Sequence, residues 1–271
     1  MLESTGTTAF AGGKMLAAKQ DGIGFLTFNQ PEKRNAMSME MWLGLGEILA
    51  QFEADSSISV VVMGGAGDKA FVSGADISQF EKNRNSADAQ KEYERVTNVG
   101  REKLHNFQKP IIAKIRGFCM GGGVAIAMAT DLRIASTDSQ FGIPAARLSI
   151  AYPPESVRRL IDLVGPAHAR MILYTARRID AKEAERIGLI NHCVAIEELD
   201  RTVMEIARSI AENAPLSVRA SKVTIDELLK DESKRNVAAM KQIMEICFDS
   251  ADYTEGRTAF MQKRRPKFVG K

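Results

Sequence analysis

The chain has 271 residues, 45% of them hydrophobic, which is enough to bury the core of one large domain or a core with a helical extension. Its net charge of +3 is too small to indicate a nucleic-acid-binding protein. No apolar run reaches the roughly 20 residues of a membrane-spanning helix, and residues 4–13 lack the basic region and cleavage pattern of a signal peptide. We therefore expect neither nucleic acid nor a membrane as a partner.

The predicted elements alternate between strand and helix along the first half of the chain. Apolar runs predict strands at 23–29, 59–63, 111–115 and 132–135. Between the first two, apolar residues recur at helical spacing: Met41, Leu45, Ile48, Leu49 and Phe52. A longer charged helix is predicted over 88–106. From Leu199 onward no strand is predicted, and helices are expected at 196–212, 216–229 and 237–248, the last with Met240, Ile243, Met244 and Cys247 on one face.

Two small-residue turns lie among these elements, at 71–77 (FVSGADI) and at 117–125 (GFCMGGGVA). Each leads from an apolar stretch into helix-like sequence, so it leaves backbone N–H groups without partners beside the positive end of a helix dipole. Glycine and alanine let a ligand atom approach such a backbone closely. Two of these N–H groups converging on one carbonyl oxygen would form an oxyanion hole. Taken alone, either turn is also compatible with plain loop geometry or with close helix–strand packing.

The cysteine, histidine and glycine patterns argue against disulfides, a metal site and a nucleotide-binding loop. The three cysteines, Cys119, Cys193 and Cys247, are widely spaced without a C-x-x-C pair, which predicts reduced, mostly buried thiols in a cytoplasmic protein. The three histidines are too scattered to indicate a metal site, so we expect none. Neither a complete dinucleotide fingerprint nor a phosphate-binding P-loop is present.

Further segments surround the two turns in a defined order. They are LTFNQPEKRNAM at 26–37, DLRIA at 131–135, FGIP at 141–144, AKEAERIGLIN at 181–191 and FMQKRRPKF at 260–268. In this order and spacing, residues 14–268 resemble the enoyl-CoA hydratase/isomerase family, also called the crotonase superfamily. The resemblance implies an α/β fold, a crotonase-like spiral of β-β-α units with a C-terminal helical trimerisation region. It also implies an acyl-CoA substrate without a separate cofactor, a role in fatty acid metabolism, and a homotrimer or dimer of trimers.

With this fold we expect a flexible lead at residues 1–13, a core with the acyl-CoA site at 14–198, and a helical region at 199–271. By the resemblance, Ala75 and Gly122 donate the two oxyanion N–H groups, and the turn before the first helix lies along coenzyme A, with Lys33, Arg34 and Ala36 in contact. Lys263 either contacts coenzyme A phosphates or belongs to a solvated helix end. The other substrate-binding residues expected from the resemblance are Ser73, Asp76, Ile77, Gly121, Ala125, Ala145 and Arg147.

Two positions depart from the family pattern. Hydration of an enoyl thioester requires a water held by carboxyl groups that act as base and acid. The family's hydratases supply two glutamates, and the corresponding positions here are Ala125 and Ala145. Neither methyl group holds a water or moves a proton. The standard hydratase mechanism therefore needs a replacement group in this chain.

Three residues of the loop after Ala145 are candidates for that role. In dehalogenase and dienoyl isomerase members of the family a carboxylate occurs in this loop, at a position that corresponds to Pro153, two residues before Glu155. Glu155 either replaces that carboxylate or is simply a first-turn carboxylate of the following helix. Tyr152 stands at the position of a loop tyrosine in methylmalonyl-CoA decarboxylase members, where it reaches the substrate or packs against the pocket wall. Arg147 either grips a substrate carboxylate as a bidentate pair or forms a structural salt bridge.

Three functions stay open at this point. The first is an enoyl-CoA hydratase/isomerase-family enzyme that acts on an acyl-CoA thioester through an enolate. The second is a decarboxylase of a malonyl- or methylmalonyl-type thioester, which needs no protein base because loss of CO2 yields the enolate directly. The third is a catalytically weak acyl-CoA-binding protein.

Overall fold

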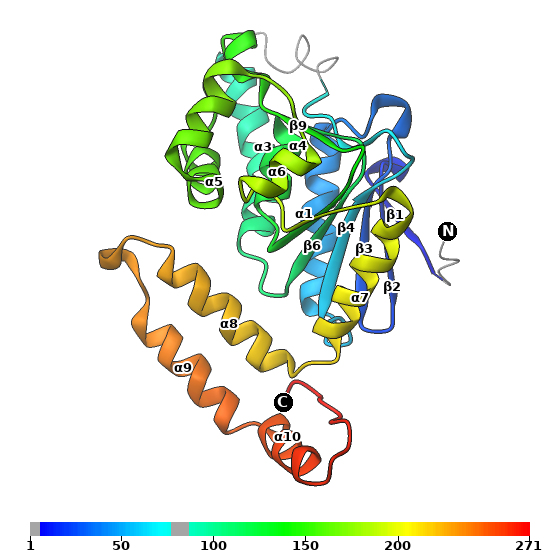
Figure 1. Cartoon of the computed structure of the whole chain (residues 1–271), viewed down its shortest axis with the longest axis vertical. Coiled ribbons are helices and arrows are strands. Elements are labelled where there is room, and N and C mark those ends of the chain that lie inside the picture. Colours follow the sequence, from blue (N-terminus) through cyan, green and yellow to red (C-terminus); the bar gives the residue numbers. More distant parts are fainter. Residues whose placement is uncertain (1–5, 77–86) are drawn as a thin grey trace.

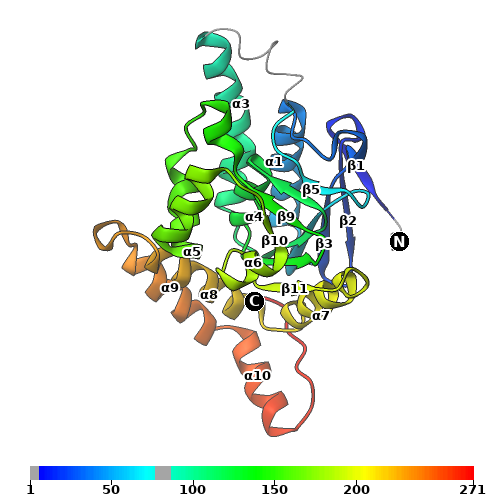
Figure 2. The same ribbon diagram turned by 45° about the horizontal axis from the view of Figure 1, so that its top comes forward.

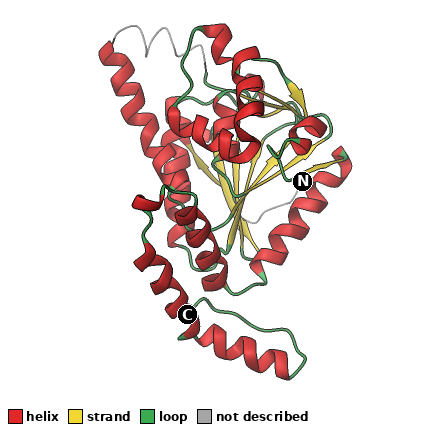
Figure 3. Ribbon diagram, turned by 60° about the vertical axis from the view of Figure 1, so that its left-hand side comes forward, coloured by secondary structure: helices red, strands yellow, loops and turns green. Residues whose placement is uncertain are grey.

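The computed structural model describes residues 6–76 and 87–271 (Figure 1). Within these ranges no helix combines the length and the apolar character that crossing a membrane requires. The described strands form two sheets that lie against each other, with helices packed around them (Figures 1 and 3).

The larger sheet has the strand order β1-β2-β3-β4-β6-β8-β11. Its strands are β1 Thr8–Phe10, β2 Met15–Gln20, β3 Ile23–Phe28, β4 Val60–Gly65, β6 Ile111–Ile115, β8 Leu132–Ser136 and β11 His192–Val194. The pairs β1–β2 and β2–β3 are antiparallel, and every pair from β3 to β11 is parallel. Strand β1 lies within residues 1–13, where we expected a flexible lead; its pairing with β2 corrects that expectation for Thr8–Phe10.

The smaller sheet has the order β10-β9-β7-β5. Its strands are β5 Ala70–Val72, β7 Phe118–Met120, β9 Gln140–Gly142 and β10 Ile179–Asp180. The pairs β5–β7 and β7–β9 are parallel, and β10 is antiparallel to β9.

Repeated β-β-α units link the two sheets. The sequence β4, β5 and helix α3 (Ala87–His105) is followed by β6, β7 and α4 (Gly122–Met128), and then by β8, β9 and α5 (Pro154–Thr175). Each unit places its first strand in the larger sheet and its second in the smaller sheet. This repetition confirms the predicted spiral of β-β-α units. It also brings the ends of β5 and β7 together, although they are far apart in the sequence.

Helix α1 (Met39–Ala54) supplies much of the main core. Its predicted apolar stripe from Met41 to Phe52 is buried, and the Ser38 hydroxyl caps the helix by accepting the N–H of Met41 at 3.3 Å. Helix α3 packs closely on α1 at Gly100, where a Cβ atom would lie 2.2 Å from the carbonyl oxygen of Trp42. The predicted helix over 88–106 is thus present as α3. From the sequence we also expect this helix to lie over the turn at 71–77, a relation that involves residues 77–86, which lie outside the described ranges.

Helix α7 (Leu199–Ala211) covers the other face of the larger sheet. Its residues Leu199, Val203 and Ala207 are buried against the sheet; the strand residues of this cluster are Ile23, Val60, Val62, Ile112 and Ile134. Short helix α6 (Ala181–Arg186) precedes it. Helix α7, the first helix of the predicted helical region 199–271, therefore packs directly on the larger sheet.

The last three helices project from the core: α8 (Pro215–Leu228), α9 (Val237–Phe248) and α10 (Ala251–Met261) (Figures 1 and 2). One ion pair joins α8 to the sheets, with the Lys222 Nζ at 2.7 and 2.8 Å from the two carboxylate oxygens of Asp131. On α9, Ile243 is buried while Met244 is exposed. Large apolar side chains that stay exposed on this block are Ile225, Leu228, Val237, Met244, Ile246, Phe248, Tyr253, Phe260 and Met261.

Candidate active site

The two small-residue turns lie side by side at the carboxyl ends of neighbouring parallel strands. Strand β5 runs into the first turn and β7 into the second, with Val72 paired to Cys119. A Cβ atom placed on Gly122 would lie 3.9 Å from the amide nitrogen of Ala75. The backbones that were expected to supply two N–H donors are therefore adjacent in space.

The N–H groups of Ala75 and Gly122 are both left without a partner. Met37 forms a parallel bridge with Ala75, in which its N–H donates to the Gly74 carbonyl at 2.8 Å and its carbonyl accepts the Asp76 N–H at 2.9 Å. This bridge directs the N–H of Ala75 to the opposite side. Gly122 is the first residue of α4, so its N–H has no acceptor within the helix. Among the described residues, neither amide donates a hydrogen bond.

The three glycines of the second turn meet different requirements. Gly121 has φ +50° and ψ −110°, a conformation that favours glycine, and its N–H donates to the Gly142 carbonyl at 2.8 Å. A Cβ atom at Gly123 would lie 2.0 Å from the Val72 carbonyl oxygen, so this glycine lets α4 pack on β5. At Gly122 nothing lies closer than 3.8 Å to such an atom. Close packing thus explains Gly123 but not Gly122, whose open side faces the Ala75 amide.

The turn before α1 is tied to the first turn by polar contacts. Lys33 Nζ donates to the carboxylate of Asp76 at 2.8 Å, and Asp76 is only 8% exposed. The backbone N–H of Ser73 donates to the carbonyl of Arg34 at 3.1 Å. Ala36 is buried. The predicted residues Lys33, Arg34, Ala36, Ser73 and Asp76 are therefore brought together, whereas Ile77 lies outside the described residues.

Two residues of this region were not singled out from the sequence. The Asn35 side chain is fully buried and donates to the carbonyls of Ala66 and Ala70 at 3.0 and 2.8 Å, so it anchors the turn to the sheet. Arg178 lies with its guanidinium carbon 5.2 Å from the ring centroid of Phe118, and Arg34 lies 5.3 Å from the same centroid. Asn35 stood inside a quoted motif, whereas no local signal marks Arg178.

The positions of the missing glutamates carry methyl groups in the structure. Ala125 lies in the first turn of α4 and Ala145 in the short 3-10 helix Pro144–Leu148, and both are half-buried. Arg147, in the same 3-10 helix, is exposed and forms no ion pair within the described ranges. Its predicted salt bridge is therefore absent there.

Tyr152 lies directly behind the second turn, whereas Glu155 does not. The Tyr152 hydroxyl donates to the carbonyl oxygen of Gly121 at 3.0 Å. Burial raises the pKa of this hydroxyl above its ordinary value. Glu155 is exposed in the first turn of α5, the position that a carboxylate favours because of the helix dipole.

Lys263 follows α10, and α10 lies far from α4, the helix that begins in the second turn (Figure 1). It is exposed, with φ +54°. Within one chain Lys263 is thus not brought to the other predicted site residues. A surface cleft of about 660 Å³ lies nearby between α10 and the C-terminal tail, lined by Ala251, Asp252, Glu255, Arg264, Arg265, Lys267 and Val269.

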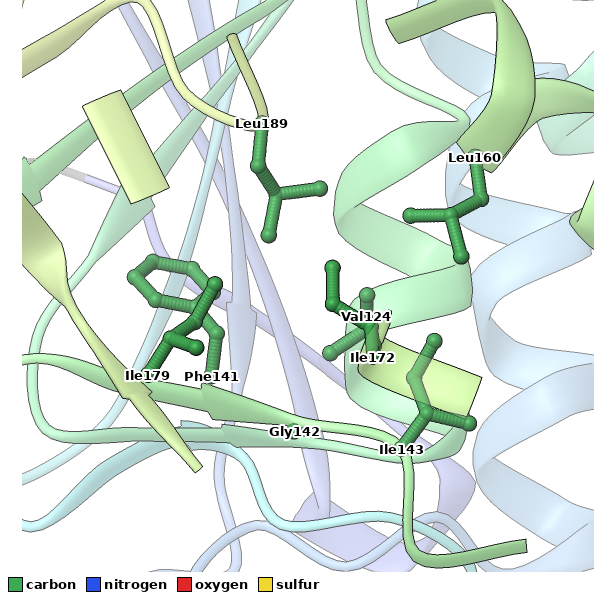
Figure 4. Close-up of a pocket in the computed structure, with 8 residues that line it drawn as sticks. All are labelled: Val124, Phe141, Gly142, Ile143, Leu160, Ile172, Ile179 and Leu189. Atoms are coloured by element: carbon green, nitrogen blue, oxygen red, sulfur yellow. The ribbon is translucent and has the colours of Figure 1, made fainter. Parts of the chain in front are cut away.

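A small apolar cavity lies on the core side of α4 (Figure 4). Its volume is about 10 Å³, and its lining residues are Val124, Phe141, Gly142, Ile143, Leu160, Ile172, Ile179 and Leu189. A volume of this size holds no more than one water molecule. The cavity is therefore a packing defect behind α4 and not an acyl-chain site.

Comparison with known proteins shows the family of this chain. Residues 18–271 match the model of the family described as enoyl-CoA hydratase/isomerase. The chain is 36% identical to the short-chain-enoyl-CoA hydratase of Clostridium acetobutylicum, over 93% of this chain and 95% of that protein. It is 35% identical to the crotonyl-CoA hydratase of Syntrophomonas wolfei, over 95% of this chain and 98% of that protein.

A solved structure of similar fold is the enoyl-CoA hydratase/carnitine racemase from Magnetospirillum magneticum, with a TM-score of 0.90, 34% identity, and coverage of 95% of this chain and 96% of that one. The chain belongs to the enoyl-CoA hydratase/isomerase family. Enzymes of this family act on coenzyme A thioesters without a separate cofactor.

Proposed function

We propose that this protein binds an acyl-CoA thioester and holds the thioester carbonyl oxygen on the N–H groups of Ala75 and Gly122. The observation that carries the proposal is the convergence of two unpaired amides, one of them at the start of a helix. Negative charge that develops on the oxygen as an enolate forms is stabilised there, by about 3 kcal/mol for each well-placed donor.

The coenzyme A moiety is expected along the turn before α1. Lys33 and Arg34 are exposed cations on this turn, and the carbonyl of Arg34 is hydrogen-bonded to the first donor loop at Ser73. A coenzyme A that lies along this turn has its phosphates close to Arg34 and to Lys33, whose ammonium also pairs with Asp76.

Hydration of a short enoyl-CoA is the first candidate reaction, because two similar relatives are named as hydratases of short-chain enoyl-CoA and crotonyl-CoA. In this reaction a water oxygen adds to the β-carbon, the electron pair moves into the enolate, and a proton then binds the α-carbon. A displaced carboxylate has to activate the water, and Glu155 is our candidate. Its exposed place in the first turn of α5 requires a movement of the loop that precedes it.

Decarboxylation is the second candidate, favoured by the methyl groups at Ala125 and Ala145. The bond between the α-carbon and the carboxylate of a malonyl-type thioester breaks, its electron pair enters the enolate, and CO2 leaves. A water or the Tyr152 hydroxyl then returns a proton to the α-carbon. An apolar surface beside the leaving carboxylate favours its loss as neutral CO2, and the exposed Arg147 is our candidate for binding the carboxylate beforehand.

Turnover of crotonyl-CoA beside methylmalonyl-CoA, followed by mass spectrometry of the thioesters, separates these reactions. A gain of one water supports hydration, and Glu155→Gln should then abolish turnover while coenzyme A binding persists. Loss of CO2 supports decarboxylation. Binding without turnover of either thioester leaves isomerisation of another acyl chain or a catalytically weak acyl-CoA-binding protein, whereas absence of acyl-CoA binding in calorimetry contradicts the whole proposal.

The assembly expected from the family, a homotrimer or a dimer of trimers, stays part of the proposal. The exposed apolar side chains of α8, α9 and α10 need a cover that one chain does not give them. Lys263 follows α10, which lies far from α4 of the same chain (Figure 1), so a contact with coenzyme A phosphates requires the site of another copy.

A further inference from the structure

Tyr152 contacts the Gly121–Gly122 peptide group on its carbonyl side, opposite to the Gly122 N–H. Its hydroxyl donates to the carbonyl oxygen of Gly121 at 3.0 Å. The same oxygen accepts the N–H of Ala125, in the first turn of α4, at 3.2 Å. The carbonyl of Gly121 is therefore held by one side chain and one backbone donor.

The carbonyl of Gly121 and the N–H of Gly122 belong to one peptide group. This group is planar and trans, so the two bonds point in opposite directions and rotate together. Glycine on both sides puts no Cβ atom in the way of such a rotation. Whatever fixes the carbonyl of Gly121 thereby fixes the direction in which the Gly122 N–H points.

A hydrogen bond to the carbonyl also changes the strength of the N–H as a donor. Hydrogen bonds in a chain polarise one another, so a peptide whose oxygen accepts a bond donates a stronger one from its nitrogen. Tyr152 is partly buried against the main core, where such bonds are stronger than in water. Because burial raises the pKa of Tyr152, the hydroxyl keeps its proton for this bond throughout the neutral range.

We propose that Tyr152 is a positioning residue of the oxyanion hole, which orients and polarises the Gly121–Gly122 peptide from behind. The inference rests on the proposed function, since it acts through the Gly122 donor, and it holds for hydration and decarboxylation alike. Its proton lies in the bond to Gly121, so Tyr152 acts on formation of the enolate and not only on its protonation.

The test uses Tyr152→Phe, which removes only the hydroxyl, beside the control Tyr174→Phe, whose ring is 74% exposed. The probe is a 2,4-dienoyl-CoA, whose conjugated thioester absorbs at longer wavelength when its oxygen accepts strong hydrogen bonds. We expect Tyr152→Phe to bind the probe with nearly unchanged affinity but with a smaller red shift than the wild type. Turnover should fall roughly tenfold at unchanged KM, the factor that one net hydrogen bond is worth. Tyr174→Phe should match the wild type.

The outcomes separate this inference from the proposed function. An equal red shift in Tyr152→Phe and wild type overturns the positioning role and leaves the proposed function standing. If the wild type does not bind the probe, or binds it without a red shift, the proposed function itself fails and the inference fails with it.

A second measurement needs no ligand. In protein labelled with [13C′,15N]glycine, a labelled amide nitrogen shows one-bond coupling to a labelled carbonyl only at a Gly–Gly peptide bond. The sequence has four such bonds: Gly12–Gly13, Gly64–Gly65, Gly121–Gly122 and Gly122–Gly123. The last two are recognised by their absence from Gly122→Ala. We expect Tyr152→Phe to shift the Gly122 nitrogen while the Gly64–Gly65 signal stays in place. If neither signal of the Gly122 pair moves, Tyr152 does not polarise this peptide.

Discussion

Arg133 is the residue that fixes the far end of the helix that carries Gly122. Its side chain is 5% exposed, and its guanidinium donates to the carbonyls of Leu189 at 2.9 Å and Thr130 at 2.6 Å, with Ala127 at 3.5 Å. Ala127 and Thr130 lie at the carboxyl end of α4, where a cation complements the helix dipole. Burial lowers the pKa of Arg133 to about 10. One end of α4 is thus held by a buried cation, and its other end presents the donor.

Arg133→Met should therefore destabilise the protein without removing any residue of the site. The backbone carbonyls that it leaves are buried and lose their donor, which we expect to lower the free energy of unfolding by about 3 kcal/mol. Urea unfolding followed by circular dichroism measures the change. Arg170→Met, at an exposed position of α5, is the control and should leave the midpoint in place. Equal midpoints for the two variants would show that the Arg133 contacts contribute nothing.

Two buried groups predict a loss of stability at high pH. Burial raises the pKa of Tyr152 and of Cys119 above their ordinary values of 10.0 and 9.0. The folded protein therefore keeps protons that the unfolded chain releases, so their contribution is complete below pH about 8 and decreases as the pH rises through 9 and 10. Unfolding free energies from urea titrations should fall between pH about 8 and about 10.5. This fall should be shallower in Tyr152→Phe; an equal slope would contradict the raised pKa of Tyr152.

At the scale of elements, the packing of α4 on β5 sets the distance between the two turns. Gly123→Ala would place a Cβ atom 2.0 Å from the Val72 carbonyl oxygen, so α4 has to move away from β5. We expect this variant to lose about 2 kcal/mol of unfolding free energy, in the range of overpacked interiors, and to bind acyl-CoA with a weakened carbonyl contact. Gly122→Ala, with no atom closer than 3.8 Å, is the matched control and should fold like the wild type. Equal stability of the two variants, measured by thermal unfolding, would contradict the close packing.

The longer elements were predictable from the sequence, and the shorter ones were not. The predicted strand at 111–115 coincides with β6, and the predicted helix at 237–248 coincides with α9. The strands of the smaller sheet have two or three residues, too few to show an alternating pattern. Helix α5 contains a further feature that periodicity does not predict, since the chain turns at Gly165, with φ +73°, before Pro166 and then continues as helix to Thr175.

In the candidate site, likewise, some features were predictable from the sequence and others were not. The two turns were predictable as sources of backbone donors because small residues follow a strand there, and the family resemblance singled out Ala75 and Gly122 within them. The structure places these two residues next to each other. The contact between Tyr152 and Gly121 joins residues 31 positions apart and depends on how the loop before α5 folds back. Arg178 likewise reaches Phe118 only through the pairing of β10 with β9 and of β9 with β7. Such contacts leave no periodic trace in the sequence.

At the scale of the whole molecule, the C-terminal helices leave an apolar surface without a cover. Phe260 and Met261 are 84% and 81% exposed on α10, far from the main core. Contacts between copies of the chain would bury these side chains and stabilise the assembly by about 25 cal/mol for each Å² of apolar surface removed from water. Self-association is therefore expected for the intact chain.

Sedimentation equilibrium tests this expectation. We expect a mass of three or six times the 29.7 kDa of one chain. Phe260→Asp combined with Met261→Asp should shift the protein towards monomers, because a charge in a buried contact is costly. A wild-type protein that stays monomeric at concentrations of about 10 μM, where stable assemblies form, would contradict the predicted assembly.

Binding of a 2,4-dienoyl-CoA to wild type, Gly122→Ala and Gly122→Pro tests whether the paired amides hold a thioester oxygen. Proline is tolerated at the first position of a helix, so Gly122→Pro removes the N–H of Gly122 with little effect on α4, while Gly122→Ala keeps it. We predict a red-shifted probe spectrum in the wild type and Gly122→Ala, and a shift that is largely lost in Gly122→Pro. Equal red shifts in Gly122→Ala and Gly122→Pro would show that Gly122 is not a donor to the thioester.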